Sequence, residues 1–305
     1  MDISVVVVSY NSSKTILETL DSIRNQVFDL KKVELIISDD VSTDSTFDLA
    51  LGWIEKHGSV FGRSFLVQSK SNMGVSHNCN NGWGEATGAW IKTIAADDVL
   101  ANNCLALNYD FVVKNPEIRI LFSKCKRFFV DINDGQYIDE DLDFFKLNSL
   151  MQNKALRSHC NLLAPTSFIQ KSLFDEIGYA DTRYSMIEDY PLWYRFTKHG
   201  VKIHHADFLS VYYRSGETLS QSKQRVANVR YLDDWFRFKR ECIWPDLSFF
   251  DLLIAFDDVV LYFNMRIGIV VFGNKRTFLF NLISKLLIAV RPYRVLRYLK
   301  SRLLK

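Results

Sequence analysis

Two adjacent carboxylates, Asp97 and Asp98, are the residues of this sequence best suited to chemistry. They end an apolar run, Trp90–Ala96, that has the composition of a buried strand. Open α/β sheets bind ligands at the carboxyl edge of their strands, and neighbouring carboxylates repel each other unless a positive group lies near them. A divalent cation with oxygen ligands, Mg²⁺ or Mn²⁺, meets both conditions. The alternative is a helix N-cap, in which Asp97 or Asp98 opens a helix through Leu105.

The elements before this pair must position it. Four runs predict strands: three of them, Ile3–Val8, Val33–Ser38 and Trp90–Ala96, as buried strands, and Phe65–Gln68 as a short strand. The residues between them predict helices that end near Gln26 and His57, and a third helix that Gly88 closes. This β-α-β-α-β-α-β order predicts an α/β fold with a doubly wound, mostly parallel sheet flanked by helices.

The carboxyl edge of that sheet would bring together Tyr10, Asp39 and Asp98. The sequence has no Gly-x-Gly-x-x-Gly after the first strand and no Gly-Lys-Ser/Thr loop, so a dinucleotide or P-loop site would lack its phosphate cradle. The second half is less regular. Its predicted strands are Arg119–Ser123, Cys125–Val130, Asn161–Phe168, Val201–His204 and Leu209–Tyr213. A helix after Pro191 stops at Gly200, and the pattern is helical from Gln221.

Composition indicates a folded globular chain of 305 residues, 48% hydrophobic and 24% charged. The net charge of +3 is too small to suggest a nucleic-acid partner. Five scattered cysteines argue against a disulfide framework and favour a reducing compartment. The N-terminus does not resemble a signal peptide, and no uninterrupted apolar run is long enough to predict a transmembrane helix.

The last thirty residues are basic and amphipathic. From Asn274 to Lys305 there are nine Lys or Arg and no Asp or Glu. An apolar face at helical spacing comprises Leu279, Leu282, Ile283, Leu286, Leu287 and Val290. Around and after Pro292, the basic residues Arg291, Arg294, Arg297 and Lys305 fall near one face. This pattern predicts helices lying in an anionic membrane interface. The alternative is packing on the chain's own domain or on a partner subunit.

Five motifs in this order resemble the family 2 glycosyltransferases of the GT-A fold. They are Val5–Asn11, Ile36–Thr46, Asn72–Gly82, Ala96–Asp98 and Glu188–Asp189. The resemblance runs from Ile3 to about Ser220. It implies a GT-A domain over residues 1–220, with a nucleotide-binding half at 1–100 and an acceptor half at 101–220. Residues 221–305 would form a C-terminal helical region, possibly membrane-associated.

The resemblance implies roles for single residues. It assigns nucleotide binding to Val8, Tyr10, Asn11, Asp39, Asp97 and Arg214. Tyr10 would stack on the base, Asp39 would accept the N3–H of a uracil, and Asp97 would reach the ribose. Asp98 would hold the Mn²⁺ or Mg²⁺ that bridges the donor phosphates, while Arg214 would help to bind them. The alternatives are a Tyr10 half-buried at a strand end and an Asp39 that caps a helix.

The same resemblance places Glu188 and Asp189 on the acceptor side. Asp189 would be the general base, and Glu188 would position it or bind the acceptor. The alternative is that this pair caps a helix with Pro191 in its first turn. One departure is Cys79, since relatives often carry an arginine there, and the lost cation would need a substitute such as Lys70 or Lys92.

The resemblance implies an inverting glycosyltransferase. It would move a sugar from a nucleoside-diphosphate donor, a UDP-sugar first and GDP or TDP as other possibilities, to a hydroxyl of a lipid-linked glycan acceptor. The setting would be bacterial surface polysaccharide synthesis of the O-antigen type, in the cytoplasm on the inner face of the cell membrane. The alternatives are a non-catalytic membrane-docking or assembly subunit, and a sugar-1-phosphate nucleotidyltransferase.

Overall fold

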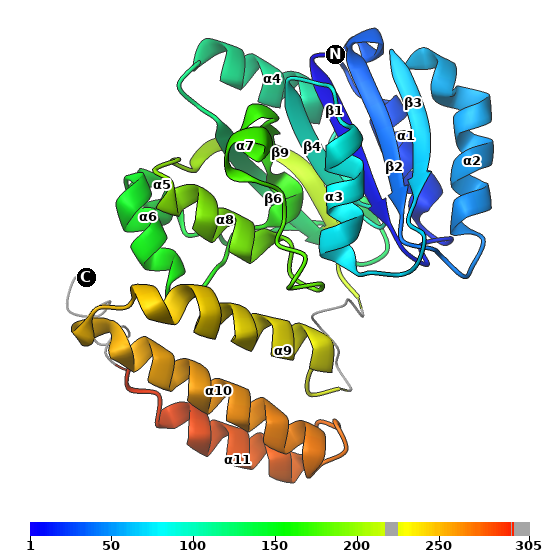
Figure 1. Cartoon of the computed structure of the whole chain (residues 1–305). Coiled ribbons are helices and arrows are strands. Elements are labelled where there is room, and N and C mark those ends of the chain that lie inside the picture. Colours follow the sequence, from blue (N-terminus) through cyan, green and yellow to red (C-terminus); the bar gives the residue numbers. More distant parts are fainter. Residues whose placement is uncertain (217–224, 294, 296–305) are drawn as a thin grey trace. The chain divides into compact units, whose positions relative to one another are not determined.

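The computed structural model describes residues 1–216, 225–293 and 295. The chain divides into two compact units, Met1–Ser215 and Gly216–Lys305 (Figure 1). Ser220, Arg294, Arg297 and Lys305, which the sequence singled out, lie outside the described residues.

The first half of the first unit is a parallel sheet with helices between its strands. The strands are β1 (Ile3–Ser9), β2 (Val33–Asp39), β3 (Arg63–Gln68) and β4 (Trp90–Ala95), and the helices are α1 (Ile16–Arg24), α2 (Thr46–His57) and α3 (Val75–Glu85). The strand order β3-β2-β1-β4 confirms the predicted doubly wound sheet. The chain leaves β1 toward β2 on one side and returns to β4 on the other. The point between β1 and β4 is therefore the topological switch point, where such sheets bind ligands.

Two local expectations in this half are wrong. Helix α3 ends at Glu85, so Gly88 does not close it. A Cβ on Gly88 would lie 2.5 Å from the backbone nitrogen of Ser4, so glycine is needed there for a close approach to β1. The N-cap alternative for Asp97 and Asp98 also fails, because the short strand β5 (Val99–Leu100) follows and α4 (Cys104–Lys114) begins after Asn103.

The second half of the first unit extends the same sheet. It adds β6 (Ile120–Phe128), β7 (Gln136–Tyr137), β8 (Phe168–Gln170) and β9 (His204–Arg214), with helices α5 (Leu142–Lys146), α6 (Ser149–Leu156), α7 (Ser172–Ile177) and α8 (Asp189–Lys198). The order continues β4-β8-β6-β9-β5. Strand β8 runs antiparallel to both of its neighbours, whereas β6 and β9 are parallel.

Sequence spacing divided this region wrongly. The two strands expected between Arg119 and Val130 are the single strand β6, and the two expected from Val201 to Tyr213 are the single strand β9. The register between β6 and β9 shifts at Ser123 and Lys124, which interrupts the alternation. Most of Asn161–Phe168 is not a strand, since it contains a short 3₁₀ turn at Ala164–Thr166.

The second unit is helical, as expected. Its main helices are α9 (Val229–Phe238), α10 (Leu252–Val270) and α11 (Phe278–Ala289). A π-helical turn, Lys239–Ile243, follows α9. Among the residues that the structure describes, no helix combines the length and the apolar character needed to cross a membrane.

Candidate active site

The ends of β1 and β4 lie side by side at the switch point. Val8 pairs with Ala95, and the Ala96 N–H donates a hydrogen bond of 3.0 Å to the Val8 carbonyl. Tyr10 follows β1 directly with 44% of its surface exposed, so its ring is open to a planar ligand. Asn11 follows in the left-handed region at φ +50°, and its Oδ1 accepts the Thr43 N–H at 2.8 Å. The backbone and Asn11 thus present Tyr10 at the edge.

Asp39 is fully buried and already has several donors. Its carboxylate accepts the backbone N–H and the hydroxyl of Ser42 at 2.9 and 2.5 Å. Gln68 and Ser9 each donate to it at 3.2 Å. Asp39 therefore joins the ends of β1, β2 and β3, and a base that donates to it has to replace one of these contacts.

Asp39 does not cap the following helix, so that alternative is wrong. Helix α2 begins at Thr46, and the Thr46 N–H donates to Asp44 at 3.0 Å. Val41, between Asp39 and this cap, has φ +61°, an uncommon backbone conformation for a β-branched residue.

Asp98 carries a buried carboxylate oxygen with no partner. Its Oδ1 accepts the Arg214 N–H at 2.9 Å, while its Oδ2 has no hydrogen-bond partner among the described residues. Burial raises the pKa of Asp98 well above its ordinary value, and the neighbouring Asp97 raises it further. A buried, unsatisfied acceptor is costly in water's absence and suits a cation. The open carboxylate oxygen of Asp98 thus fits the predicted Mg²⁺ or Mn²⁺.

A metal bound at Asp98 would have few protein ligands. Within the described ranges, no group of three or more His, Cys, Asp or Glu side chains could hold a metal ion. Mg²⁺ is commonly held by one or two carboxylates together with substrate phosphates and waters. Asp98, with Asp97 beside it, fits that sparser kind of site.

Arg214 lies across the Asp97–Asp98 pair. Its Nε donates to the Asp97 carbonyl at 2.8 Å, and its guanidinium also pairs with Glu18. The guanidinium lies 4.5 Å from the centre of the Phe128 ring. Burial raises the pKa of Asp97, and the positive charge of Arg214 opposes that rise. The end of β9 thus brings a cation to the end of β4, where the diphosphate of a donor was expected.

Glu188 and Asp189 stand at the start of α8. Glu188 occupies the N-cap position, but its side chain does not cap the helix. Asp189 Oδ1 accepts the Tyr190 N–H at 2.7 Å. Burial raises the pKa of Glu188 to about 8, and the charge of Asp189 adds to the effect. Burial also raises the pKa of Asp189, which the Tyr190 N–H opposes. Such a pair can hold or take up a proton near neutral pH.

The third motif holds the segment that leads to this pair, a role that the sequence did not reveal. Ser76 donates from its hydroxyl to the Tyr184 carbonyl at 2.5 Å and from its backbone to the Ser185 carbonyl at 3.2 Å. Asn80 exchanges two hydrogen bonds of 2.9 Å with the Ala180 backbone. Residues 180–185 are therefore fastened to α3, which belongs to the first half of the unit.

Gly74 and Asp40 complete this connection. Gly74 has φ +93°, and a Cβ on it would lie 2.5 Å from the Ser185 carbonyl oxygen. Asp40 accepts the N–H groups of Met73 and Gly74 at 3.1 and 2.8 Å. The second acidic residue of the second motif thus sets the loop that carries the third. The position of Asp40 directly after Asp39 in the second motif was the sequence signal that could have indicated this role.

The cation expected near Cys79 has no substitute in Lys92. Lys92 is fully buried in β4 and donates to the carbonyls of Pro165 and Ser167 at 2.6 and 3.3 Å. It ties β4 to the segment before β8. Burial raises the pKa of the Cys79 thiol, and the charges of Glu188 and Asp189 raise it further. Cys79 therefore stands close to the acidic pair.

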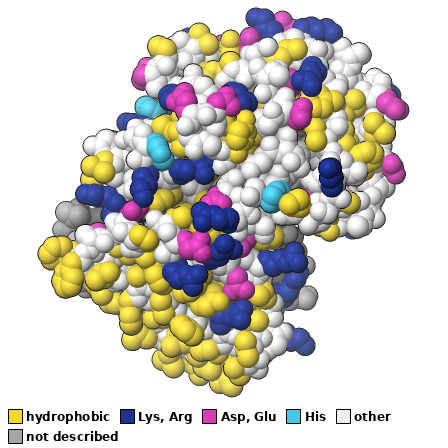
Figure 2. Space-filling view, viewed as in Figure 1, with side chains coloured by type: hydrophobic (Ala, Val, Ile, Leu, Met, Phe, Trp, Pro, Cys, Tyr) yellow, Lys and Arg dark blue, Asp and Glu magenta, His cyan; other side chains and the backbone are white. Residues whose placement is uncertain are grey.

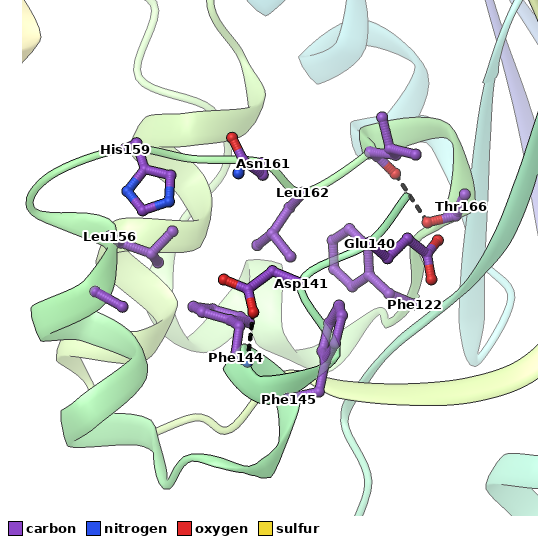
Figure 3. A pocket seen from close by; sticks show the side chains of 12 residues that line it. Phe122, Glu140, Asp141, Phe144, Phe145, Leu156, His159, Asn161, Leu162 and Thr166 are labelled. Atoms are coloured by element: carbon purple, nitrogen blue, oxygen red, sulfur yellow. Dashed lines mark hydrogen bonds between the residues drawn. The ribbon is translucent and has the colours of Figure 1, made fainter. Parts of the chain in front are cut away.

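A separate small pocket lies in the second half of the first unit (Figure 3). Aromatic and aliphatic side chains line it, among them Phe122, Phe144, Phe145 and Leu156. Phe122 packs edge-on against Trp193 of α8, with ring centres 5.2 Å apart. No predicted site residue lines this pocket.

Comparisons with known proteins agree with the motifs. The model of the family described as glycosyl transferase family 2 matches residues 4–178, which is more than half of the chain. WfaP of Escherichia coli, a UDP-Glc:alpha-D-GlcNAc-diphosphoundecaprenol beta-1,3-glucosyltransferase, is 25% identical over 215 residues, covering 70% of this chain and 76% of WfaP. The glycosyltransferase GlyG of Streptococcus pneumoniae is 23% identical over 266 residues, covering 83% of this chain and 85% of GlyG.

Solved structures share the fold. S. aureus TarS 1-349 in complex with UDP-GlcNAc matches with a TM-score of 0.61 at 21% identity, over 88% of this chain and 73% of that one. The chain spans 44% of the longer TarS structure. The mannosyltransferase PcManGT of Pyrobaculum calidifontis, in complex with GDP-Man and Mn²⁺, matches with a TM-score of 0.54 at 18% identity, over 87% and 64%. The chain therefore belongs to glycosyl transferase family 2, with the GT-A fold that its motifs predicted.

Proposed function

We propose that the protein is an inverting glycosyltransferase that moves a sugar from a UDP-sugar to a hydroxyl of a lipid-linked glycan. The observation that carries the proposal is the unpartnered Oδ2 of Asp98 at the switch point, beside Arg214. In this proposal residues 1–100 bind the nucleotide and residues 101–220 bind the acceptor.

On the donor side, Tyr10 stacks on the base, and Val8 and Asn11 shape the edge around it. Asp97 reaches the ribose, while Asp39 accepts from the base after exchanging one of its present donors. Asp98 holds Mn²⁺ or Mg²⁺ together with the donor diphosphate. When bound, that cation supplies Lewis-acid stabilisation of charge on the departing nucleoside diphosphate. Arg214 adds positive charge there. The structural neighbour TarS 1-349 binds UDP-GlcNAc, and the relative WfaP is a UDP-Glc glucosyltransferase, which together support a uridine donor.

On the acceptor side, Asp189 takes the proton of the attacking hydroxyl. The raised pKa of this buried carboxylate makes it a stronger base than an exposed aspartate. Glu188, whose pKa is raised to about 8, is largely protonated at neutral pH and can donate a hydrogen bond to the acceptor or to Asp189. A single base without a covalent intermediate fits inversion.

The acceptor in this proposal is carried by a membrane lipid, and the enzyme sits peripherally on the inner face of the cell membrane. The name of WfaP includes a diphosphoundecaprenol acceptor, which supports this for a relative of similar length. The nine Lys and Arg after Asn274 supply attraction to anionic lipid.

Calorimetric titration tests the donor assignment. UDP, GDP, TDP and CDP are each titrated into the wild type and into Asp98→Asn, with Mn²⁺ and with EDTA. We expect UDP to bind in a metal-dependent way, and Asp98→Asn to lose that dependence. Transfer from UDP-Glc and UDP-GlcNAc to a GlcNAc-diphospholipid is then measured. Binding without any transfer or donor hydrolysis favours the non-catalytic subunit, and pyrophosphate release from UTP and a sugar 1-phosphate favours the nucleotidyltransferase.

A further inference from the structure

Helix α10 buries several polar residues and exposes several large apolar ones. Its buried residues include Asp257, Asp258 and Asn264, whereas Phe256, Phe263 and Val270 are exposed. These three apolar residues are seven positions apart, which is two helical turns, so they form one stripe along the helix. Phe263 is 59% exposed and Val270 is 72% exposed, although Asn264 between them is fully buried. A helix packed for water would show the reverse pattern.

The inward polar residues have partners within the second unit, although the Oδ1 of Asn264 accepts no hydrogen bond from the described residues. Asp258 pairs with the fully buried Lys239 at 3.2 Å and accepts the Trp244 indole N–H at 3.1 Å. Asn264 donates to the Ser284 hydroxyl of α11 at 2.8 Å. Breaking such contacts would leave buried charge or polar atoms unpaired, so they hold α10 in this orientation. The exposed stripe is thus a built feature of the unit.

Helix α11 adds a second apolar stripe beside the first. Phe278, Leu282, Leu286 and Val290 recur every four residues and are all exposed, Phe278 by 85% and Leu286 by 66%. The Asn264–Ser284 contact fixes α11 against α10. In Figure 2 the hydrophobic side chains gather in one broad area over these two helices (Figures 1 and 2). We call this surface, formed by the exposed apolar residues of α10 and α11, the apolar face.

Cations accompany the apolar face. Lys275 and Arg276 are exposed in the turn between α10 and α11, and Lys285 is exposed on α11. The chain has no acidic residue after Asn274. Exposed phenylalanines next to lysines and arginines suit a bilayer interface with anionic headgroups, because the rings enter the acyl boundary while the cations stay with the phosphates.

We propose that the apolar face of α10 and α11 docks on an anionic lipid bilayer. This proposal names the surface responsible for the membrane location in the proposed function. Its purpose rests on that function, because docking would bring the active site to a lipid-linked acceptor. The binding itself needs no donor, acceptor or activity. It therefore stands or falls separately from the transfer reaction.

Vesicle flotation of the full chain tests the proposal, with phosphatidylcholine vesicles prepared with and without phosphatidylglycerol. We expect binding to the anionic vesicles, weakened by salt. The double variant Phe263→Ser/Leu286→Ser should lower the partition at least about tenfold, and Lys275→Gln/Arg276→Gln should lower it by a smaller factor on anionic vesicles alone. The matched control is Val113→Ser/Val130→Ser, which removes two exposed apolar side chains of the first unit and should leave binding unchanged.

A second pair, Val270→Ser/Phe278→Ser, tests the same face should the first variant fold poorly, as thermal unfolding would show. The proposal is overturned when wild type does not float with anionic vesicles, or when both apolar variants bind as wild type does. Analytical sedimentation without lipid tests whether a second copy of the chain occupies the apolar face instead. A wild-type dimer that the apolar variants convert to monomers, with no vesicle binding, assigns the face to a second copy. UDP binding, measured on the same variants, should equal that of wild type. If wild type floats with anionic vesicles but binds no UDP, the transferase proposal fails and the membrane proposal stands.

Discussion

The protein has two acidic pairs that look alike in sequence and differ in their surroundings. Asp97–Asp98 follows a strand, and the backbone and side chain of Arg214 approach both of its members. Glu188–Asp189 begins a helix, and Asp189 accepts a short hydrogen bond from the backbone of the next residue, Tyr190. Burial raises the pKa values of both pairs. Two similar acidic dipeptides thus differ in what they suit: the first has an open oxygen that could bind a cation, and the second has raised pKa values that favour holding a proton.

The difference lies in what each pair can do with its unmet charge. Asp98 has one oxygen anchored by a backbone N–H and one oxygen without a partner, so its geometry is fixed and a divalent cation can complete it. The side chain of Glu188 makes no capping hydrogen bond to α8, and burial raises its pKa to about 8, which favours a bound proton near neutral pH. Substitution of each pair should therefore produce different defects, which the following predictions separate.

The largest effect is expected from Asp189→Asn. Removal of a general base should lower kcat by roughly 10² to 10⁴ while the affinity for UDP stays unchanged. Transfer assays and calorimetry on the same preparation measure both quantities. The control is Asp143→Asn, an exposed carboxylate with 88% of its side chain in solvent. Full activity in Asp189→Asn, with loss in Glu188→Gln, would move the base to Glu188.

Asp98→Asn should act on donor binding. The amide keeps an acceptor for the Arg214 N–H but is a poor cation ligand, so UDP affinity with Mn²⁺ should drop by about 10- to 100-fold, to the value measured in EDTA. Without ligand the variant should be more stable than wild type by about 1 kcal/mol, because it no longer buries an unpartnered carboxylate. Denaturant unfolding in EDTA checks this, with Asp48→Asn on the surface of α2 as control. A variant with wild-type metal dependence would remove Asp98 from the metal site.

Glu188→Gln should change how stability depends on pH. The folded-state pKa of about 8 lies above the ordinary value of 4.5, so between these values the native state binds more protons than the unfolded state. The stability associated with this proton is complete below pH about 4.5 and is lost as pH rises through 8. The glutamine variant lacks this loss, so its advantage over wild type should grow with pH between these values, by at most about 1.4 kcal/mol per pH unit. Denaturant unfolding from pH 5 to 8.5 measures it.

The exposed Glu55→Gln in α2 is the control, and its stability difference from wild type should be flat across the same range. A flat profile for Glu188→Gln would mean that Glu188 is ionised in the native state, and the contrast between the two pairs would disappear.

The sequence predicted strands β1 to β4 well, because the signals for them are local. Buried β-branched runs and capping residues in β1 to β4 are read within a few positions, and the parallel order then follows from chain connectivity. Strand β6 was split in prediction because polar Lys124 and a register shift interrupt its pattern. Irregular pairing of this kind depends on the partner strand, which spacing cannot show.

The contacts across the site were out of reach for a different reason. Asn80 meets Ala180, and Asp98 meets Arg214, at separations of 100 and 116 residues. The family resemblance placed Asp98 and Arg214 in one site, but which oxygen of Asp98 is anchored and which is left open is a property of packing. The burial of polar residues in α10 was hidden likewise, because Asp257 and Asp258 read in sequence as interruptions of an apolar run.

The smallest effect is expected at Val41, whose φ of +61° stands beside the buried Asp39 and Asp40 of the donor side. A β-branched side chain is strained there, whereas asparagine tolerates the left-handed region and spares the entropy cost of glycine. Val41→Asn should therefore raise the free energy of unfolding by about 0.5 to 1 kcal/mol, and Val41→Ala should gain less. Since four hydrogen bonds hold Asp39 independently of this side chain, UDP affinity should stay within about twofold. Lower stability in Val41→Asn would show that packing of the valine outweighs its backbone strain, and a large loss of UDP affinity would mean that the strain itself positions the donor side.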